Sequence, residues 1–213
     1  MKSTFEGFSR NACMFFAGLE KDNSKLWFEA NRKTFESQVK EPFAALLAAL
    51  PDRHHPFKVF RLNRDTRFSN DKSPYKLMHG AAHSRKGGSI EYLHLDKDGV
   101  LLAAGTYVME PDKLAKFRVA LTNDATAKTF KRMSARLAEN GLLLNPGGSK
   151  PLSSAPRGIA ADHHMIEWLR WKGCVSMERI ASGDLAVGPK LLKHVEQWWR
   201  KAEPLNTWLD DVL

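Results

Sequence analysis

The spacing of apolar residues changes twice along the 213-residue chain, and this restricts the folds that it can adopt. From about residue 5 to 20 the apolar residues recur at helical spacing, and a second helical pattern runs from about 25 to Pro51. Pro42 lies inside the second pattern and predicts a kink or the start of a new helix, because proline has no amide hydrogen to donate. The N-terminal quarter is therefore predicted to be helical.

The middle of the chain has the patterns of β-strands. FKVFRL alternates, and KLMHGAAHS and SIEYLHLD indicate two strands joined by a turn at residues 85–88. Asp98-Gly99 is typical of a tight hairpin turn. It leads into VLLAAGTYVM, which is apolar on both faces and is therefore predicted to be a central strand.

Helical spacing returns at Pro111, a residue suited to the first turn of a helix. The remaining predicted elements are one long or two short helices over 111–140, a loop rich in Pro, Gly and Ser over 145–158, a short helix near 163–170, a possible strand at 171–177 and a C-terminal helix interrupted at Pro204. This order predicts a single α+β domain over residues 1–213, with a mostly antiparallel central sheet flanked by N-terminal and C-terminal helices.

The composition favours a cytoplasmic protein, and its basic charge is one reason to consider an anionic partner. The formal net charge is +9, and the two cysteines form no disulfide framework. No apolar stretch is long enough to cross a membrane. Because the lysines and arginines are scattered, the charge by itself is better explained by a basic but otherwise ordinary solvated surface, and the anionic partner is the alternative explanation of it.

The charged segment RLNRDTRFSNDKSPYK, residues 61–76, lies between predicted strands and is the first candidate site. Asp65 can share one side of the chain with a neighbouring arginine, whose other donors then remain available for a planar anion. The candidate ligand-binding residues are Arg61, Arg64, Arg67, Ser69, Lys72, Tyr75 and Lys76, with Asp65 as the orienting and candidate catalytic carboxylate. Phe68 is expected to anchor the loop in the core. The alternative is a salt-bridged loop that only connects helix to sheet.

A second candidate segment is APRGIAADHHMIEWLR. Arg157 could join the first cluster, with Asp162 and His163 as a candidate acid–base pair. Alternatively, Asp162 is the N-cap of a helix that begins at His163. His163 and His164 are adjacent, so on a helix they could not face one point.

No motif identifies a metal or a cofactor. The chain has no HExxH, paired CxxC or EF-hand spacing, no phosphate-binding loop and no nucleophile elbow. We therefore predict no metal site, and the cofactor stays unknown. Basic segments at 84–86 and 128–136 could contact nucleic acid, although the second also fits the solvated face of an amphipathic helix.

The order R-x-x-RD-x-RFS-x-DKSPYK resembles the hallmark of an uncharacterised bacterial and fungal family known as domain of unknown function 2461. The opening FSRNACMFFAGLEKDNSKLWFEANRKTFESQVKEPF, the sheet region and PRG-x-x-x-DH are similar to the family's segments. Ala103-Ala104 stands where glycines are more usual, and His164 where proline is common. The resemblance spans about residues 5 to 200. It implies a single α+β domain and brings no established activity.

The resemblance also directs attention to Trp27-Phe28, as a core anchor or a pocket wall, and to Asn31, as a hydrogen-bond partner of the charged loop. The favoured hypothesis is an arginine-rich pocket for a phosphate- or carboxylate-bearing small molecule, with hydrolysis or group transfer as the natural chemistry if the protein is an enzyme. The other is a nucleic-acid-associated or protein-interaction module in which the charged motif is structural. The salt dependence of binding distinguishes the small-anion hypothesis from the nucleic-acid hypothesis, because polyanion binding weakens steeply with ionic strength. The oligomeric state is not predicted.

Overall fold

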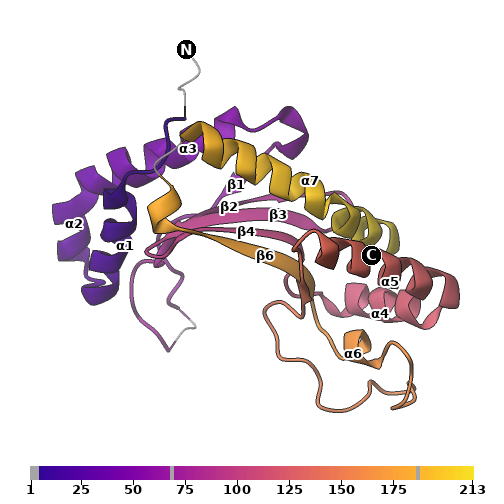
Figure 1. Ribbon diagram of the computed structural model, residues 1–213. Coiled ribbons are helices and arrows are strands. Elements are labelled where there is room, and N and C mark those ends of the chain that lie inside the picture. Colours follow the sequence, from indigo (N-terminus) through magenta and orange to yellow (C-terminus); the bar gives the residue numbers. More distant parts are fainter. Residues whose placement is uncertain (1–4, 68–69, 186–187) are drawn as a thin grey trace. The chain divides into compact units, whose positions relative to one another are not determined.

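A computed structural model describes residues 5–67, 70–185 and 188–213 of the chain (Figure 1). The fold is α+β, with a six-stranded antiparallel sheet in the order β1-β2-β3-β4-β6-β5. The strands are β1 Lys58–Val59, β2 Met78–Ser84, β3 Ile90–Asp96, β4 Gly99–Thr106, β5 Leu144–Asn145 and β6 Cys174–Ala181. The predicted fold class is confirmed.

Two compact units make up the chain. The first comprises Met1–His83, Tyr92–Leu102 and Arg179–Gln197, and the second comprises Ser84–Glu91, Ala103–Glu178 and Trp198–Leu213. The expectation of a single domain over residues 1–213 stays a prediction.

The first N-terminal helix begins later than the apolar spacing indicates, whereas the second begins at Lys25 as predicted. They are α1 Arg10–Lys21, α2 Lys25–Thr34, the π-helical segment η1 Phe35–Lys40 and α3 Glu41–Ala49, followed by the short 3₁₀ turn η2 Asp52–His54. The predicted helical start near residue 5 is wrong, because Ser9 is extended and α1 begins after it. Phe5 and Phe8 are buried nonetheless, so their spacing reflects core packing rather than a helical turn.

Pro42 marks a change of helix rather than a kink within one. The residues before it form η1, where the Glu41 amide donates to the carbonyl of Glu36, five residues back. Pro42 then lies in the first turn of α3. Amide groups in the first turn have no acceptor within the helix, so the missing hydrogen of proline costs no helical hydrogen bond. Single π-helical turns are frequent at functional sites, and this one carries several side chains of the pocket described below.

The core of the first unit is largely aromatic. Phe15 of α1 lies with its ring centroid 5.4 Å from Trp27, 6.2 Å from Phe28 and 5.5 Å from Phe35. The helices also pack on β2, because Phe35 and Phe43 contact the ring of His79 edge-on. Burial of these large rings fixes the helices against the strand.

The hairpins form as predicted. The Arg85 amide donates to the Ser89 carbonyl at 2.9 Å and closes the turn at 85–88. Gly99 adopts φ +126°, and a Cβ there would lie 2.1 Å from the Ile180 carbonyl oxygen, so only glycine fits the second turn. Strand β4 lies between β3 and β6, as expected for a central strand. The strand predicted for FKVFRL shortens to Lys58–Val59, because after the bond from the Phe60 amide to Gly80 the chain leaves the sheet.

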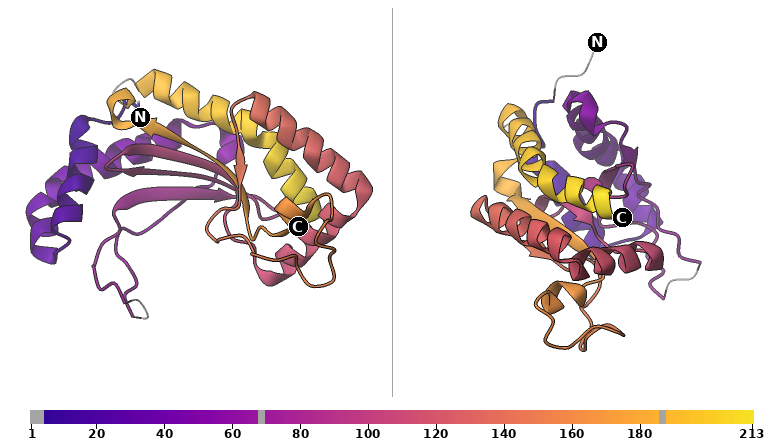
Figure 2. Two further views of the ribbon diagram at one scale, coloured as in Figure 1. Left: turned by 60° about the horizontal axis from the view of Figure 1, so that its bottom comes forward. Right: turned by 90° about the vertical axis from the view of Figure 1, so that its right-hand side faces the viewer.

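The second unit contains two helices over residues 111–139, where the sequence predicted either one long helix or two short ones. They are α4 Pro111–Thr122 and α5 Asp124–Glu139, which lie side by side in Figure 2. Asn123 separates them and caps α5 through its side-chain oxygen. The rings of Phe117, Phe130 and Trp208 form the core, with centroids 4.8 to 6.2 Å apart.

Three boundaries in the C-terminal part differ from the predictions. The strand predicted at 171–177 is β6, which runs from Cys174 to Ala181. The short helix α6 is Ile166–Leu169, so it does not begin at His163 and Asp162 is not its N-cap. The 3₁₀ turn η3 Ser182–Asp184 follows β6, and α7 then runs as one helix from Gly188 to Val212. Pro204 lies inside α7 without ending it. The buried face formed by Ala202, Leu205 and Leu209 maintains the helix across the missing hydrogen bond.

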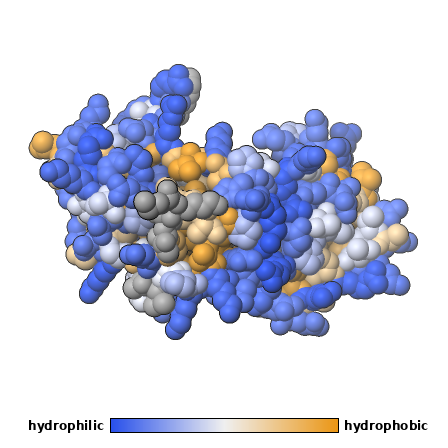
Figure 3. Space-filling view, turned by 90° about the horizontal axis from the view of Figure 1, so that it is seen from above, coloured by the Kyte–Doolittle hydropathy of each residue, from blue (hydrophilic) through white to orange (hydrophobic). Residues whose placement is uncertain are grey.

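Hydrophilic side chains cover most of the face shown in Figure 3. Among the described residues, no helix is both long and apolar enough to cross a membrane.

Candidate anion-binding pocket

The described residues of the charged segment, 61–67 and 70–76, form an antiparallel loop that extends from β1 and β2 (Figure 2). The Lys76 amide donates to the Leu62 carbonyl, and the Arg64 amide donates to the Pro74 carbonyl, both at 2.8 Å. Asn63 and Tyr75 form the bridge between these two bonds. Among the described residues, the loop therefore has a paired base at 62–64 and 74–76 and a tip that includes 65–67 and 70–73.

The charges at the tip mostly satisfy one another. Arg67 donates to Asp65 through Nε at 3.0 Å and Nη2 at 2.7 Å, and these bonds lower the pKa of Asp65. Arg64 pairs with Asp71, and Lys72 donates to the Thr66 carbonyl. The predicted orientation of an arginine by Asp65 is present, but the Arg67 and Asp65 side chains are 77% and 60% exposed. Exposed ion pairs of this kind stabilise a protein little. Ser69 and Phe68 lie outside the described residues.

The base of the loop is attached to the N-terminal helices. The Asn23 side chain donates to the Tyr75 carbonyl at 3.0 Å and accepts from the Tyr75 amide at 3.1 Å. The Tyr75 ring stacks on Phe28 of α2, with centroids 4.3 Å apart. Asn31, the expected partner of the loop, instead donates to the Trp27 carbonyl within its own helix.

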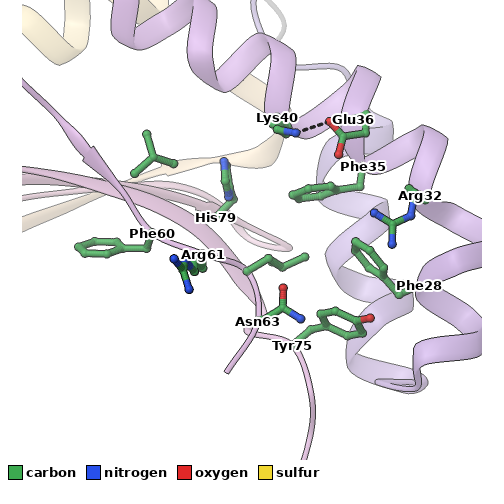
Figure 4. Close-up of a pocket in the computed structure, with 12 residues that line it drawn as sticks. Phe28, Arg32, Phe35, Glu36, Lys40, Phe60, Arg61, Asn63, Tyr75 and His79 are labelled. Atoms are coloured by element: carbon green, nitrogen blue, oxygen red, sulfur yellow. Dashed lines mark hydrogen bonds and ion pairs between the residues drawn. The ribbon is translucent and has the colours of Figure 1, made fainter. Parts of the chain in front are cut away.

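A pocket of about 370 Å³ lies between these helices and the base of the loop (Figure 4). Its volume is within the range of about 300–1,000 Å³ typical of small-molecule sites. Side chains of α2 and η1 form one wall, and residues following β1 form the other. The lining residues are Phe28, Arg32, Phe35, Glu36, Lys40, Val59, Phe60, Arg61, Leu62, Asn63, Tyr75 and His79.

Three cationic side chains and one carboxylate give the pocket a positive balance. Lys40 pairs with Glu36 at 2.6 Å, and Arg32 pairs with Glu29, which does not line the pocket. Arg32 also lies over the Phe28 ring, 5.1 Å from its centroid, and so stays near the aromatic wall. Arg61 makes no hydrogen bond or ion pair with the part of the chain that the structure describes. Its donors are available to a ligand.

His79 contributes a neutral polar group to this pocket. It is 6% exposed, and its Nδ1 has no hydrogen-bond partner among the described residues. Burial, with a smaller effect of Lys40, lowers the pKa of His79 to about 4. The imidazole is therefore uncharged at neutral pH, and the positive charge of the pocket comes from Arg32, Lys40 and Arg61.

The pocket contains two of the predicted site residues, Arg61 and Tyr75. Lys76 lies over the ring of Phe60, 5.7 Å from its centroid, and does not itself line the pocket. Arg64, Asp65, Arg67 and Lys72 belong to the loop, outside the lining set.

The second predicted segment belongs to the second unit. Arg157 and Asp162 are exposed, and the Nδ1 of His163 accepts from the Met165 amide at 3.1 Å. His163 and His164 lie before α6, so the expectation for adjacent residues on a helix does not apply to them. Their rings stack with centroids 4.7 Å apart. That these residues share a site with segment 61–76 stays a prediction.

Sequence analysis missed Arg32, Lys40, Asn63 and His79. The sequence does contain a signal for Arg32 and Lys40, because residues 32, 36 and 40 recur every four positions and therefore share one face of a helix. For His79, the position in a predicted strand gave no indication of a pocket. Phe28 forms part of the wall, one of the two roles foreseen for it.

The fold and the pocket together define an α+β protein with a cationic, aromatic-walled cavity beside a charged loop. A family model described as "Conserved hypothetical protein (DUF2461)" matches residues 11–208. The chain belongs to this family, as the charged motif indicated. No curated protein and no solved structure gives a significant match.

Proposed function

We propose that the protein binds a small organic anion, bearing phosphate or carboxylate, in the pocket at Arg32, Lys40 and Arg61. The observation that supports this most directly is Arg61, a guanidinium without a partner among the described residues at the edge of a cavity with excess positive charge. A guanidinium offers a planar set of donors that suits carboxylate and phosphate oxygens.

The aromatic wall supports an organic ligand rather than an inorganic ion alone. Phe28, Phe35, Phe60 and Tyr75 present apolar ring surface, while Asn63 and His79 add uncharged polar groups. Pockets for small molecules typically combine such apolar walls with a few polar groups that fix the orientation of the ligand. Hydrolysis or group transfer on the anion would be the natural chemistry for an enzyme with this site.

A thermal-shift screen of the purified chain tests the proposal. The panel contains inorganic phosphate, nucleoside monophosphates, sugar phosphates, organic acids and a short oligonucleotide. A ligand at about 100 times its Kd adds about 2.7 kcal/mol of apparent stability. We expect a shift with at least one small anion in the wild type and in Arg67→Ala, and loss of the shift in Arg61→Ala.

Arg67→Ala is the matched control, because it removes an arginine of the same loop that does not line the pocket. Equal loss of the shift in both variants, or no shift with any small anion, would overturn the proposal. A shift with the oligonucleotide alone that disappears with salt would favour the nucleic-acid alternative.

A further inference from the structure

His79 is a buried polar group in the pocket of the first unit, and the described protein leaves it without a hydrogen bond. Its ring is held edge-on by Phe35 and Phe43, with centroids 5.6 and 4.8 Å away. Neither ring nitrogen bonds to a described residue. Nδ1 is fully buried, so Nε2 is the nitrogen that can face the cavity. Because buried polar groups in folded proteins are nearly always hydrogen-bonded, a bound ligand is the natural partner of this imidazole.

Arg61 and Lys40 lie next to His79 on two other segments. The pairing of β1 with β2 continues past the end of β1, since the Phe60 amide donates to the Gly80 carbonyl at 2.8 Å. The next facing pair is therefore Arg61 and His79, and facing side chains of paired strands have Cβ atoms about 4.5–5.5 Å apart. Burial and, to a lesser extent, the charge of Lys40 lower the pKa of His79, so Lys40 is also near the ring. Figure 4 shows His79 between the side chains of Lys40 and Arg61.

These three donors border one part of the cavity from three separate segments, namely β2, η1 and the chain after β1. A carboxylate has two oxygens in one plane, and a single guanidinium on one side suits it. A phosphate monoester has three terminal oxygens that do not share a plane with the phosphorus atom, so it can accept from donors on several sides. Its charge of about −2 at neutral pH also matches the two cations. The arrangement therefore suits phosphate better than carboxylate.

Glu36 competes with a bound anion for Lys40. The Lys40 and Glu36 side chains pair at 2.6 Å and are 54% and 39% exposed. Such exposed pairs contribute little stability, so a dianion can replace Glu36 at Lys40 while the Glu36 carboxylate turns to water. Among the described lining residues, the other charged or titratable groups are Arg32, which pairs with Glu29, and Tyr75.

We propose that the ligand of this pocket is a phosphate monoester whose terminal oxygens accept hydrogen bonds from His79 Nε2, Arg61 and Lys40. This substrate class rests on the proposed function and narrows its anion from phosphate or carboxylate to phosphate. The neutral imidazole donates from Nε2, so binding selects one tautomer. The imidazole also gains a proton more readily when the anion is bound, because a neighbouring negative charge favours the imidazolium.

Calorimetry at pH 7.5 with phenyl phosphate and benzoate tests the choice between phosphate and carboxylate, because the two compounds share a ring and differ in the anionic group. We expect phenyl phosphate to bind at least about tenfold more tightly, since a further hydrogen bond to a charged group changes affinity by about that factor. Equal or tighter binding of benzoate would overturn the phosphate assignment and leave the proposed function supported. If neither compound binds at millimolar concentration, both proposals fail.

Inorganic sulfate tests the role of His79, because it is tetrahedral and keeps its double negative charge over the pH range used. The pKa of His79 is about 4 without ligand, and we expect an NMR titration of the ring to give about 6 with saturating sulfate. By linkage, the sulfate Kd should fall about threefold from pH 7 to pH 5.5 in the wild type.

His79→Gln should remove this pH dependence, because its amide can donate a hydrogen bond but cannot take up a proton. Glu36→Gln should retain it, which excludes the Glu36 carboxylate as its source. An unchanged pKa of His79 in saturating sulfate, or the same pH dependence in His79→Gln as in the wild type, would contradict the contact with Nε2. Thermal midpoints of both variants establish that they are folded.

Variants at Lys40 and Glu36 should change the affinity for phenyl phosphate in opposite directions. Lys40→Met removes a donor and should weaken binding about tenfold. Lys33→Met should have no such effect, because Lys33 is exposed and does not line the pocket. Glu36→Gln frees Lys40 and should tighten binding about two- to fivefold, the range expected for an exposed ion pair.

Glu41→Gln is the control for Glu36→Gln, because it removes the same charge at an exposed position outside the lining set. It should leave the affinity for phenyl phosphate close to that of the wild type. Weaker binding by Glu36→Gln, or equal losses in Lys33→Met and Lys40→Met, would show that Lys40 does not hold the phosphate and would overturn the three-donor site.

Discussion

Asn23 and Tyr75, 52 residues apart in sequence, exchange two hydrogen bonds in which the Asn23 side chain replaces a backbone partner for Tyr75. The side chain both donates to the Tyr75 carbonyl and accepts from its amide, as a neighbouring strand would. This contact joins the turn between α1 and α2 to the base of the charged loop. It thereby holds Tyr75 against Phe28, in the wall of the pocket.

Replacing Asn23 with alanine should destabilise the protein. The change leaves the Tyr75 amide and carbonyl without their partner in a half-buried setting, and we expect the free energy of unfolding to fall by about 1–3 kcal/mol. Urea denaturation of the variant and the wild type measures the difference.

Asn31→Ala is the matched control, because the Asn31 side chain, within the described part of the chain, bonds only to the Trp27 carbonyl of its own helix. Its loss should cost less than about 1 kcal/mol, since alanine is the better helix former. Equal destabilisation by the two variants would show that the contact between Asn23 and Tyr75 has no special role.

His79 should make stability depend on pH. The pKa of its imidazole is about 4 in the folded protein against 6.5 in the reference state. Between these values the unfolded chain binds a proton that the folded chain does not. Stability due to neutral His79 is therefore complete above pH 6.5 and is lost as pH falls towards 4.

At about 1.4 kcal/mol per pH unit, the loss through His79 amounts to about 3 kcal/mol. His79→Phe removes the titration and retains a ring against Phe35 and Phe43. Urea midpoints at pH 7 and pH 4 should therefore differ less in the variant than in the wild type. Parallel pH dependence in the two proteins would contradict the lowered pKa, which an NMR titration of the ring measures independently.

Local sequence patterns predicted the elements more reliably than their ends. Asp98-Gly99 fixed a hairpin because the turn needs the positive φ that Gly99 adopts. Phe5 and Pro204 led to wrong predictions of helix boundaries, because each was interpreted from its neighbours in the sequence alone. Phe5 is buried by tertiary packing outside any helix, and the apolar contacts of α7 maintain the helix through Pro204.

The pocket was only partly predictable, because it is assembled from three separate segments. Arg61 and Tyr75 lie in the charged motif that the sequence singled out, but Arg32 and His79 reach the cavity only through tertiary packing.

Asp210 should stabilise the second unit, because it joins the end of α7 to the turn at residues 85–88. It accepts from Arg85 Nε at 2.6 Å and from the Ser89 amide at 3.0 Å, and its side chain is 18% exposed. Burial alone would lower the pKa of Arg85, but its bonds to Asp210 and Glu203 raise it. Asp210→Ala leaves a half-buried guanidinium with one carboxylate fewer and the Ser89 amide without this acceptor. We therefore expect a loss of about 2–3 kcal/mol.

The neighbouring Asp211 provides the control, because its side chain is exposed and makes no hydrogen bond with any described residue. Asp211→Ala should change stability by less than about 0.5 kcal/mol. The loss of stability in Asp210→Asn should lie between those of Asp210→Ala and Asp211→Ala. The amide oxygen of asparagine can still accept from the Ser89 amide, but the ionic attraction to Arg85 is lost. Urea denaturation of the three variants at low and high salt would test this order. If Asp210→Ala and Asp211→Ala lose equal stability, the turn does not depend on Asp210, and its close approach to Gly87 alone holds the two segments together.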